Sequence, residues 1–184
     1  TVGKKIDGFR FYEIDGKAYP SVTTVLGIQK KQDLQQWRDK IGEKVADWEM
    51  GRAARRGKAT HTLVEQYIKG ETPSERGVLP LGLFRLLKPY VDQIDNVHLL
   101  ETIMYSPKLT IAGQVDCVAE YNGKLSVIDF KTANSERKEN WIENYFMQCS
   151  AYAQMYEELF EKEVSQVVVL LAASVTIQVK IFSP

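Results

Sequence analysis

Apolar positions dominate two runs within residues 111–132, and the runs meet at Asn122-Gly123. Runs of this composition, bounded by turn residues, are typical of β-strands. An Asn-Gly pair between two such runs favours a two-residue hairpin, because a type I′ turn needs a positive φ at both central residues. If these two residues form the whole loop, Tyr121 pairs with Lys124 and the two strands are antiparallel.

The same register brings two carboxylates face to face. Counting outward from the turn places Asp116 opposite Asp129 and Gln114 opposite Lys131. Because strand side chains alternate between faces, Asp116, Asp129 and Lys131 are predicted to project from one side. Like charges directly opposite each other destabilise a sheet. A divalent cation between the two carboxylates would remove that cost.

An exposed Asp-x-Lys strand is the competing interpretation, since this pattern is common on solvated sheet faces. Here, however, Asp129 and Lys131 lie at the end of an apolar run that begins at Val127 and has the composition of a buried segment. Burying a charge is costly unless the charge is paired or coordinates a metal ion. We therefore favour a metal site at this hairpin over a solvated face.

The rest of the chain contains further segments with strand or helix patterns. Strands are predicted over residues 9–14, 17–19, 99–105, 167–172 and 175–182. Short and long helices are predicted over residues 22–26, 33–50, 60–69, 81–94 and 141–162. Asp15-Gly16 marks a second hairpin, and Ser21 is the predicted N-cap of the first helix. Residues 172–175, between the last two predicted strands, contain few of the residue types that favour turns.

The segment 33–50 is predicted to form one long helix with Asp33 as its N-cap. Its apolar residues recur at helical spacing, which places them on one face: Leu34, Trp37, Ile41, Val45 and Trp48. We therefore expect both tryptophans in the core, without a functional role. Gly51 then interrupts the pattern, and the next helix ends at Gly70.

The order of these segments predicts an α/β protein with a mixed central β-sheet flanked by α-helices. At 184 residues the chain is long enough to bury a substantial core. We expect a single domain over residues 1–184. Its N-terminal hairpin and helices are expected over 1–95, and the sheet and helix that carry the candidate chemistry over 96–184.

Composition narrows the setting in which the protein is expected to act. No apolar run approaches the roughly 20 residues needed to span a bilayer, and no signal peptide is recognisable, so no membrane association is expected. The two cysteines, Cys117 and Cys149, are too few for a disulfide scaffold or a four-cysteine cluster. Cys117 alternates with Asp116 and is expected to face the core. Because the cysteines are so few, we expect the protein to act in an intracellular, reducing compartment.

Charge is unevenly distributed although the net charge is zero. Residues 1–70 carry 14 Lys and Arg against 9 Asp and Glu, and residues 71–184 carry 10 against 15. A basic first part beside an acidic hairpin suits an enzyme that processes a polyanion. Four cations could line a phosphate backbone or could form an ordinary solvated helix face: Arg52, Arg55, Arg56 and Lys58.

His61 and Glu65 lie four residues apart on the predicted helix and share a face. Such a pair can be a metal ligand with an orienting acid. It can equally be an ordinary surface pair, which the spacing alone favours.

Four short motifs occur in the order and at the approximate spacing found in RecB-like nucleases of the PD-(D/E)XK superfamily. They are Gly57-x-x-x-His61, Gly113-x-x-Asp116, Asp129-x-Lys131 and Gln148-x-x-x-Tyr152. Each motif alone is weak, but together they resemble that family over most of the chain, from about residue 19 to 170. Within the superfamily, the chain is similar to mitochondrial and phage-type exonucleases. The resemblance implies a restriction-endonuclease-like fold.

The resemblance also implies a role for each matched residue. His61, Asp116 and Asp129 would bind the catalytic Mg²⁺ or Mn²⁺, and the backbone carbonyl of Phe130 would complete the shell. Lys131 would orient or help to deprotonate the attacking water and steady the phosphate. Hard, oxygen-rich ligation with one imidazole suits these cations better than a thiol-rich zinc site does.

Other matched residues would support the site. Gln148 and Tyr152 would hold the site and the DNA strand, and Glu65 and Glu101 are candidates for roles around the metal ligands. Some RecB-like nucleases bind an iron–sulfur cluster through four cysteines. The two cysteines of this chain cannot supply such ligands, so no iron–sulfur cluster is expected.

The implied activity is that of a metal-dependent DNA exonuclease that hydrolyses phosphodiester bonds and prefers single-stranded DNA or free ends. Two alternatives stay open, because the fold does not encode end-dependence. One is an endonuclease or structure-specific nuclease on the same fold, and the other is a non-catalytic DNA-binding module. The expected location is the cytoplasm of a bacterial or virus-infected cell, with mitochondria as the alternative.

Overall fold

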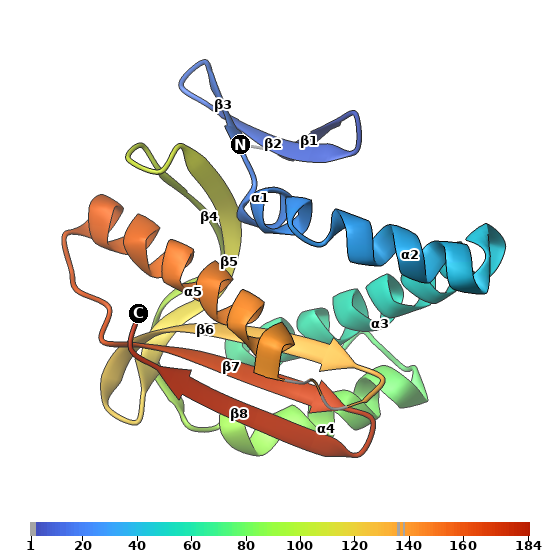
Figure 1. The fold of residues 1–184 in the computed structure, drawn as a ribbon. Coiled ribbons are helices and arrows are strands. Elements are labelled where there is room, and N and C mark those ends of the chain that lie inside the picture. The colour runs from blue at the N-terminus through green and yellow to red at the C-terminus, as the bar shows by residue number, and fades with distance from the viewer. Residues whose placement is uncertain (1–2, 136, 138) are drawn as a thin grey trace.

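A five-stranded sheet forms the centre of the protein and contains the predicted hairpin (Figure 1). The computed structural model describes residues 3–135, 137 and 139–184. In spatial order the strands are β4 (Ile94–Ser106), β5 (Ile111–Tyr121), β6 (Lys124–Ala133), β7 (Gln166–Ala173) and β8 (Thr176–Phe182). β6 and β7 are parallel, and the other neighbours are antiparallel. The predicted mixed sheet is therefore confirmed.

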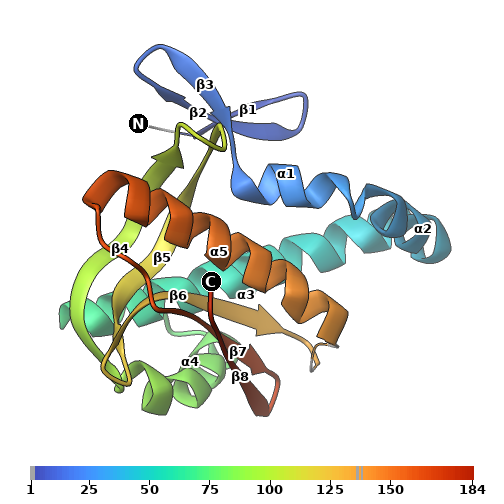
Figure 2. The same cartoon turned by 60° about the vertical axis from the view of Figure 1, so that its left-hand side comes forward.

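Helices cover both faces of this sheet (Figure 2). The described residues form five of them: α1 (Val22–Ile28), α2 (Lys31–Ile41), α3 (Glu43–Lys69), α4 (Val78–Val91) and α5 (Glu139–Phe160). α5 connects β6 to β7, as a parallel pair requires a crossover connection. It covers one face, while α4 and the second half of α3 cover the other. The predicted α/β class is confirmed.

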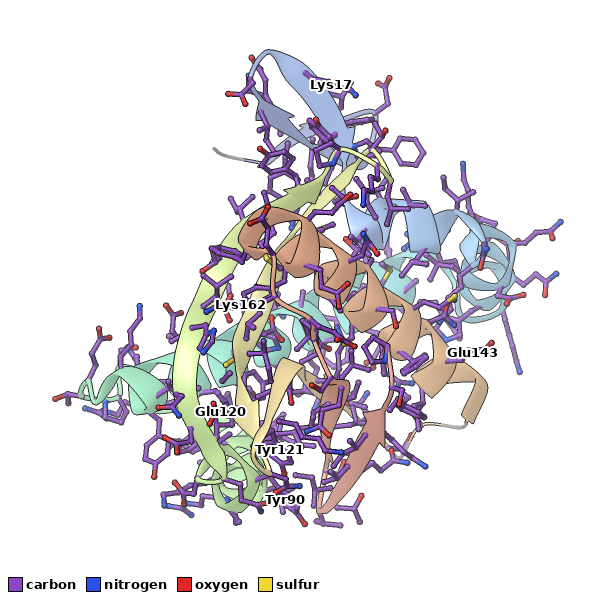
Figure 3. All side chains as sticks on the ribbon, turned by 90° about the vertical axis from the view of Figure 1, so that its left-hand side faces the viewer. Lys17, Tyr90, Glu120, Tyr121, Glu143 and Lys162 are labelled. Carbon is purple, nitrogen blue, oxygen red and sulfur yellow. The ribbon has the colours of Figure 1, made fainter. Side chains whose placement is uncertain are left out.

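Alternation along the strands divides the core between these two faces. Val127 packs toward α5, and its neighbour Ile128 packs toward α4. Cys117 belongs to the α4 side, as its alternation with Asp116 predicts, and is fully buried. Tyr121, the last residue of β5, is buried next to Tyr90 of α4 (Figure 3). None of the helices built from the described residues is both long and apolar enough to cross a membrane.

The β5–β6 hairpin has the predicted register. Tyr121 pairs with Lys124 around the turn, where Asn122 and Gly123 have φ of 51° and 75°. The ladder ends at Cys117–Ile128, one pair before the two carboxylates. Beyond that point β5 continues beside β4 and β6 continues beside β7, so the strands diverge (Figure 1). The predicted pairing of Gln114 with Lys131 is wrong, because the ladder does not reach it.

The prediction of one helix over residues 33–50 is wrong. α2 ends at Ile41, and Gly42 has φ of 89°, a conformation outside the helical region. α3 then continues through Gly51, because a glycine within a helix costs only about 1 kcal/mol. Trp37 and Trp48 are 37% and 57% exposed, so they are not core residues. Helical spacing gives residues a common face but supplies no partner to cover it.

A second, three-stranded sheet lies at the far end of β4 and β5 (Figure 1). It contains β1 (Gly3–Ile6), β2 (Phe9–Ile14) and β3 (Lys17–Pro20), of which β1 was not predicted. Tyr12 and Tyr19 pack on Ala112 of β5, and the Ser21 side chain caps α1 as predicted. The joint before β8 is a two-residue turn in which Ser174 takes a φ of 54°.

Candidate active site

The gap between β5 and β6 is lined by polar groups of both strands. Asp116 is buried, and its Oδ2 accepts a hydrogen bond of 2.9 Å from the Phe130 amide. This bond bridges the strands just beyond the end of their ladder. Asp129 is the next β6 residue after that ladder and is only 1% exposed. Asp116 and Asp129 are therefore both buried, each one residue beyond the last pair of the ladder.

His61 of α3 reaches the same gap. Its Nε2 donates to the Phe130 carbonyl oxygen at 2.6 Å, while its Nδ1 lies 3.5 Å from Asp116 Oδ1 and 3.9 Å from Glu101 Oε1. One ligand atom from each of His61, Glu101 and Asp116 lies within 4.8 Å of the others. The strands β4 and β5 and the helix α3 thus each supply one side chain to a potential metal-binding site.

Glu101 enters this group through an unusual backbone. Its φ is 46°, in the left-handed region, and the flanking residues Leu100 and Thr102 pair with β5 while Glu101 is skipped. A left-handed residue other than glycine costs on the order of 1–3 kcal/mol and persists only when its surroundings hold it. Gln114 Nε2 holds the Glu101 carboxylate with a hydrogen bond of 2.8 Å. Glu101 was predicted only as a supporting residue. Its carboxylate, however, lies close enough to His61 and Asp116 to bind the same metal ion.

The fit of this site to a cation is seen at Asp129. Its Oδ2 is buried and forms an ion pair of 3.0 Å with Lys131 Nζ, and no hydrogen bond to it is found among the described residues. A buried carboxylate oxygen without a hydrogen-bond partner is rare in folded proteins. Together with the neighbouring carboxylate of Asp116, it forms an oxygen-rich site suited to Mg²⁺ or Mn²⁺.

A chain of side chains from α5 fixes Lys131. Lys131 Nζ donates to Gln148 Oε1 at 3.0 Å, and Gln148 Nε2 donates to the Tyr152 hydroxyl at 3.2 Å. The ring of Tyr152 lies against Gly113, where a Cβ atom would come within 2.7 Å of ring atom Cε1. Gln148 and Tyr152 are buried, which suits support of Lys131 more than contact with a DNA strand.

Burial and mutual charge shift the ionisation of these groups. Burial, with the neighbouring Asp129 carboxylate, raises the pKa of Asp116. Burial acts to lower the pKa of His61, but the nearby carboxylates outweigh it and raise that pKa to about 9. Asp129 and Asp116 likewise raise the pKa of Lys131 despite its burial. Without a cation, these raised pKa values therefore favour the protonated forms of His61 and Asp116.

The other predicted site residues are not gathered into one surface. Arg52, Arg55 and Lys58 are exposed on α3, whereas Arg56 is buried and donates to Asn134 Oδ1. The predicted pairing of His61 with Glu65 is not seen. Glu65 instead forms an ion pair of 2.7 Å with Lys69, one turn further along the helix.

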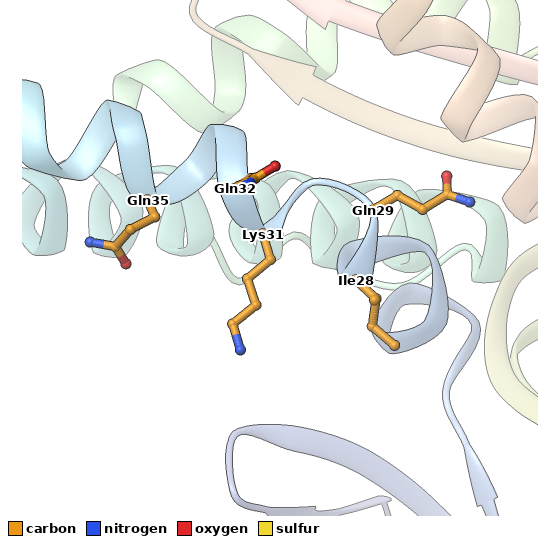
Figure 4. Close-up of a pocket in the computed structure, with 5 residues that line it drawn as sticks. All are labelled: Ile28, Gln29, Lys31, Gln32 and Gln35. Atoms are coloured by element: carbon orange, nitrogen blue, oxygen red, sulfur yellow. The ribbon is translucent and has the colours of Figure 1, made fainter.

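A hollow of about 380 Å³ lies at the joint between α1 and α2 (Figure 4). Its lining comes from a short stretch of chain: Ile28, Gln29, Lys31, Gln32 and Gln35. None of the predicted site residues borders it, and its lining offers no carboxylate, imidazole or thiol. The candidate chemistry is therefore at the gap in the sheet and not in this hollow.

A mixed sheet with buried carboxylates and a lysine at a split between two strands belongs to a recognised class of proteins. Residues 34–180 match the family model described as PD-(D/E)XK nuclease superfamily. The chain therefore belongs to this superfamily, as its four motifs predict. The matched residues make up most of the chain and include all four motifs.

Within this superfamily, the chain is similar to curated exonucleases of one name from three organisms. The chain is 33% identical over 138 residues to mitochondrial genome maintenance exonuclease 1 of Homo sapiens. The proteins of the same name from Mus musculus and Xenopus tropicalis are each 29% identical, over 137 and 148 residues. These matches cover 69%, 69% and 72% of this chain and 40%, 40% and 42% of the relatives. The chain thus spans about two fifths of their length.

Proposed function

We propose that this protein is a divalent-metal-dependent deoxyribonuclease that degrades DNA strands from their ends and prefers single-stranded DNA. The observation that carries the proposal is that ligand atoms of His61, Glu101 and Asp116 lie within 4.8 Å of one another. Asp129, which is ion-paired with Lys131, adds a further buried carboxylate at the same end of the hairpin ladder. Membership of a nuclease superfamily supports cleavage of phosphodiester bonds. The name exonuclease, carried by the relatives, supports action at strand ends.

The cation in this proposal is Mg²⁺ or Mn²⁺. His61 Nδ1 and the carboxylates of Asp116, Asp129 and Glu101 would hold it, and the Phe130 carbonyl remains a candidate ligand although it accepts from His61 in this structure. When bound, such a cation neutralises charge that builds up on the phosphate and lowers the pKa of a coordinated water. The buried Asp129 Oδ2, to which no hydrogen bond is found among the described residues, supports this assignment.

Lys131 is the residue we assign to the reacting phosphate. In hydrolysis the water oxygen bonds to phosphorus, the bond from phosphorus to the leaving sugar oxygen breaks, and a proton passes from the water to the products or the solvent. The ammonium of Lys131 carries a raised pKa and stays charged, so it donates hydrogen bonds rather than accepting that proton. Gln148 orients it, and Asp129 balances its charge.

Two further parts of the proposal concern the substrate and the compartment. Exposed arginines and a lysine on α3 support binding of a DNA backbone: Arg52, Arg55 and Lys58. Cys117 and Cys149 are both free thiols in buried positions, which supports a reducing compartment. The bacterial or virus-infected cytoplasm and the mitochondrion both satisfy that requirement, and the relatives' name favours the mitochondrion.

One assay tests the activity and its alternatives together. Single-stranded DNA labelled at the 5′ or the 3′ end is incubated with Mg²⁺, Mn²⁺ or EDTA, beside covalently closed single-stranded circles. Loss of linear strands alone, only with a metal ion, supports the exonuclease. Loss of circles as well indicates an endonuclease, and survival of both substrates indicates a binding module. The position of the label that is released first gives the polarity.

A further inference from the structure

The first half of α3 carries an exposed tryptophan within a row of exposed basic side chains. We call these residues the Trp48 stripe: Lys44, Trp48, Arg52, Arg55 and Lys58. The pitch of an α-helix places them within an arc of about 120° around its axis, so they share one face. The rise per residue makes the stripe roughly 21 Å long. Because every member is exposed, the stripe is open to an extended ligand.

Two arginines flank the ring of Trp48. The Arg52 guanidinium lies over this ring, with its Cζ 5.2 Å from the ring centroid, in a cation–π contact. Arg55 folds back across Gly51, where a Cβ atom would come within 3.2 Å of its Nη1. The tryptophan is nevertheless 57% exposed. The stripe therefore presents a flat apolar surface directly beside positive charge.

The described chain leaves the positive charge of the stripe unneutralised. None of its four cations forms an ion pair with a carboxylate of the described residues. Glu43 and Asp47, which are close to the stripe in sequence, are both paired with Arg38 of α2. Glu49 lies outside the arc, on the side of the helix that carries Arg56. The stripe therefore favours a ligand with negative charges along its length.

The same helix continues from the stripe into the candidate active site. His61 follows Lys58 by three residues, which is about 4.5 Å along the helix axis. The His61 imidazole is bound to the Phe130 carbonyl of β6. The other end of the stripe lies on the part of α3 that extends away from the sheet (Figure 1). A linear ligand that follows the stripe is therefore led toward His61.

We propose that the Trp48 stripe binds the single-stranded DNA that enters the active site, with an unpaired base stacked on Trp48 and phosphates on the flanking cations. The inference deepens the proposed function and rests on it. Aromatic side chains in a positively charged track are a common means of binding single strands without sequence preference. In a duplex the base faces are covered by stacked neighbours, so Trp48 would favour single strands over double strands.

The test is DNA binding with EDTA present, so that no strand is cut. Fluorescent single strands of roughly 12 nucleotides are compared with strands of equal length that lack bases, at several salt concentrations. Trp48→Ala should weaken binding to the normal strand by about fivefold or more, as for one lost stacked base. Its binding to the baseless strand should equal that of the parental protein. Trp37→Ala is the matched control, because Trp37 is also exposed but lies on α2, and it should bind both strands as the parental protein does.

The cations of the stripe should have a different signature from that of the tryptophan. Arg55→Gln should lower the slope of log affinity against log salt by about 0.7 on both strands, as for one lost phosphate contact. Trp48→Ala should leave that slope unchanged, because it removes no charge. Arg85→Gln, which removes an exposed arginine of α4, is the matched control for charge and should also leave the slope unchanged.

A second variant keeps the test decisive if Trp48→Ala does not fold. Trp48→Phe keeps a stacking ring but removes the indole, so it should retain most of the affinity while DNA quenches less of the tryptophan fluorescence. Equal quenching in this variant and the parental protein would overturn the proposal. A folded Trp48→Ala protein that distinguishes the two strands as the parental protein does would also overturn it, as would an equal loss with Trp37→Ala. Failure of the nuclease proposal would appear instead as absent cleavage with Mg²⁺ or Mn²⁺ while stacking on Trp48 persists.

Discussion

His61 Nε2 lies 2.6 Å from the carbonyl oxygen of Phe130, so the imidazole of α3 is fixed to the backbone of β6. The Nε2 must carry the proton of this bond, because a carbonyl only accepts. Nδ1 then faces the carboxylates of Asp116 and Glu101, at 3.5 and 3.9 Å. A metal-binding histidine commonly donates its second N–H to a backbone carbonyl in this way. The arrangement prepares Nδ1 as a ligand.

His61→Ala is therefore expected to raise the Mg²⁺ or Mn²⁺ concentration needed for half-maximal cleavage. We expect a shift of at least about tenfold, since even partners outside the ligand set contribute roughly 10–100-fold to metal affinity. Glu65→Ala is the matched control, because Glu65 lies one turn further on the same helix but pairs with Lys69. An unchanged metal titration for His61→Ala would contradict the assignment, and a shift for Glu65→Ala would restore that residue to the site.

Asp116→Asn tests the carboxylate that bridges the hairpin. The asparagine oxygen can still accept from the Phe130 amide, so the fold should persist. Cleavage should fall by at least roughly 100-fold, because a bound metal ion supplies several kcal/mol of transition-state stabilisation. In thermal unfolding, Mn²⁺ at 100 times its Kd should stabilise the parental protein by about 2.7 kcal/mol and the variant by far less. Equal metal-induced shifts in both proteins would exclude Asp116 as a ligand.

Gly113→Ala tests the support of Lys131 from behind. The added Cβ would come within 2.7 Å of the Tyr152 ring, so the ring must move and the hydrogen bond from Gln148 must change. Overpacking of this kind costs about 1–3 kcal/mol of unfolding free energy. We expect that loss in urea denaturation, together with a lower cleavage rate at saturating metal. Gly82→Ala on α4 meets nothing within 4 Å and should be neutral or stabilising.

The parts of the site that could be predicted depend on local chemistry. Asn122-Gly123 can form a type I′ turn with little strain, and that turn sets the register of the ladder that ends one residue before Asp116 and Asp129. The capping serine before α1 and the glycine that ends α3 follow similar local rules. These features depend on neighbours in sequence, and a pattern of residues reports them directly.

The parts that could not be predicted depend on contacts between distant segments. Glu101 becomes a potential ligand only because β4 holds it at a φ of 46° against β5, and no residue pattern announces that conformation. Trp37 and Trp48 have the spacing of core residues, but α2 and the start of α3 lie away from the sheet (Figure 1). Arg56 resembles its exposed neighbours in sequence, but it is buried and donates to Asn134, which lies 78 residues further along the chain.

Metal binding should release protons, and the sign of the effect follows from the pKa shifts. Burial opposes the charged imidazole of His61, but Asp116 and the other carboxylates outweigh it and raise its pKa to about 9, so His61 is protonated at neutral pH. Burial and Asp129 raise the pKa of Asp116, which also favours a bound proton. A cation must displace these protons before it can bind. Affinity for Mn²⁺ should therefore rise with pH and level off above about pH 9.

Isothermal titration calorimetry in two buffers of different ionisation enthalpy measures the released protons directly. At neutral pH we expect at least about one proton to be released for each cation that binds. The affinity for the cation should then rise about tenfold per pH unit for each proton displaced. His61→Ala should release fewer protons, because the group with the raised pKa is gone. Proton release equal to that of the parental protein would mean that the protons come from the carboxylates alone. An affinity that does not change with pH below 9 would show that a cation binds without displacing the proton of His61, and hence away from its Nδ1.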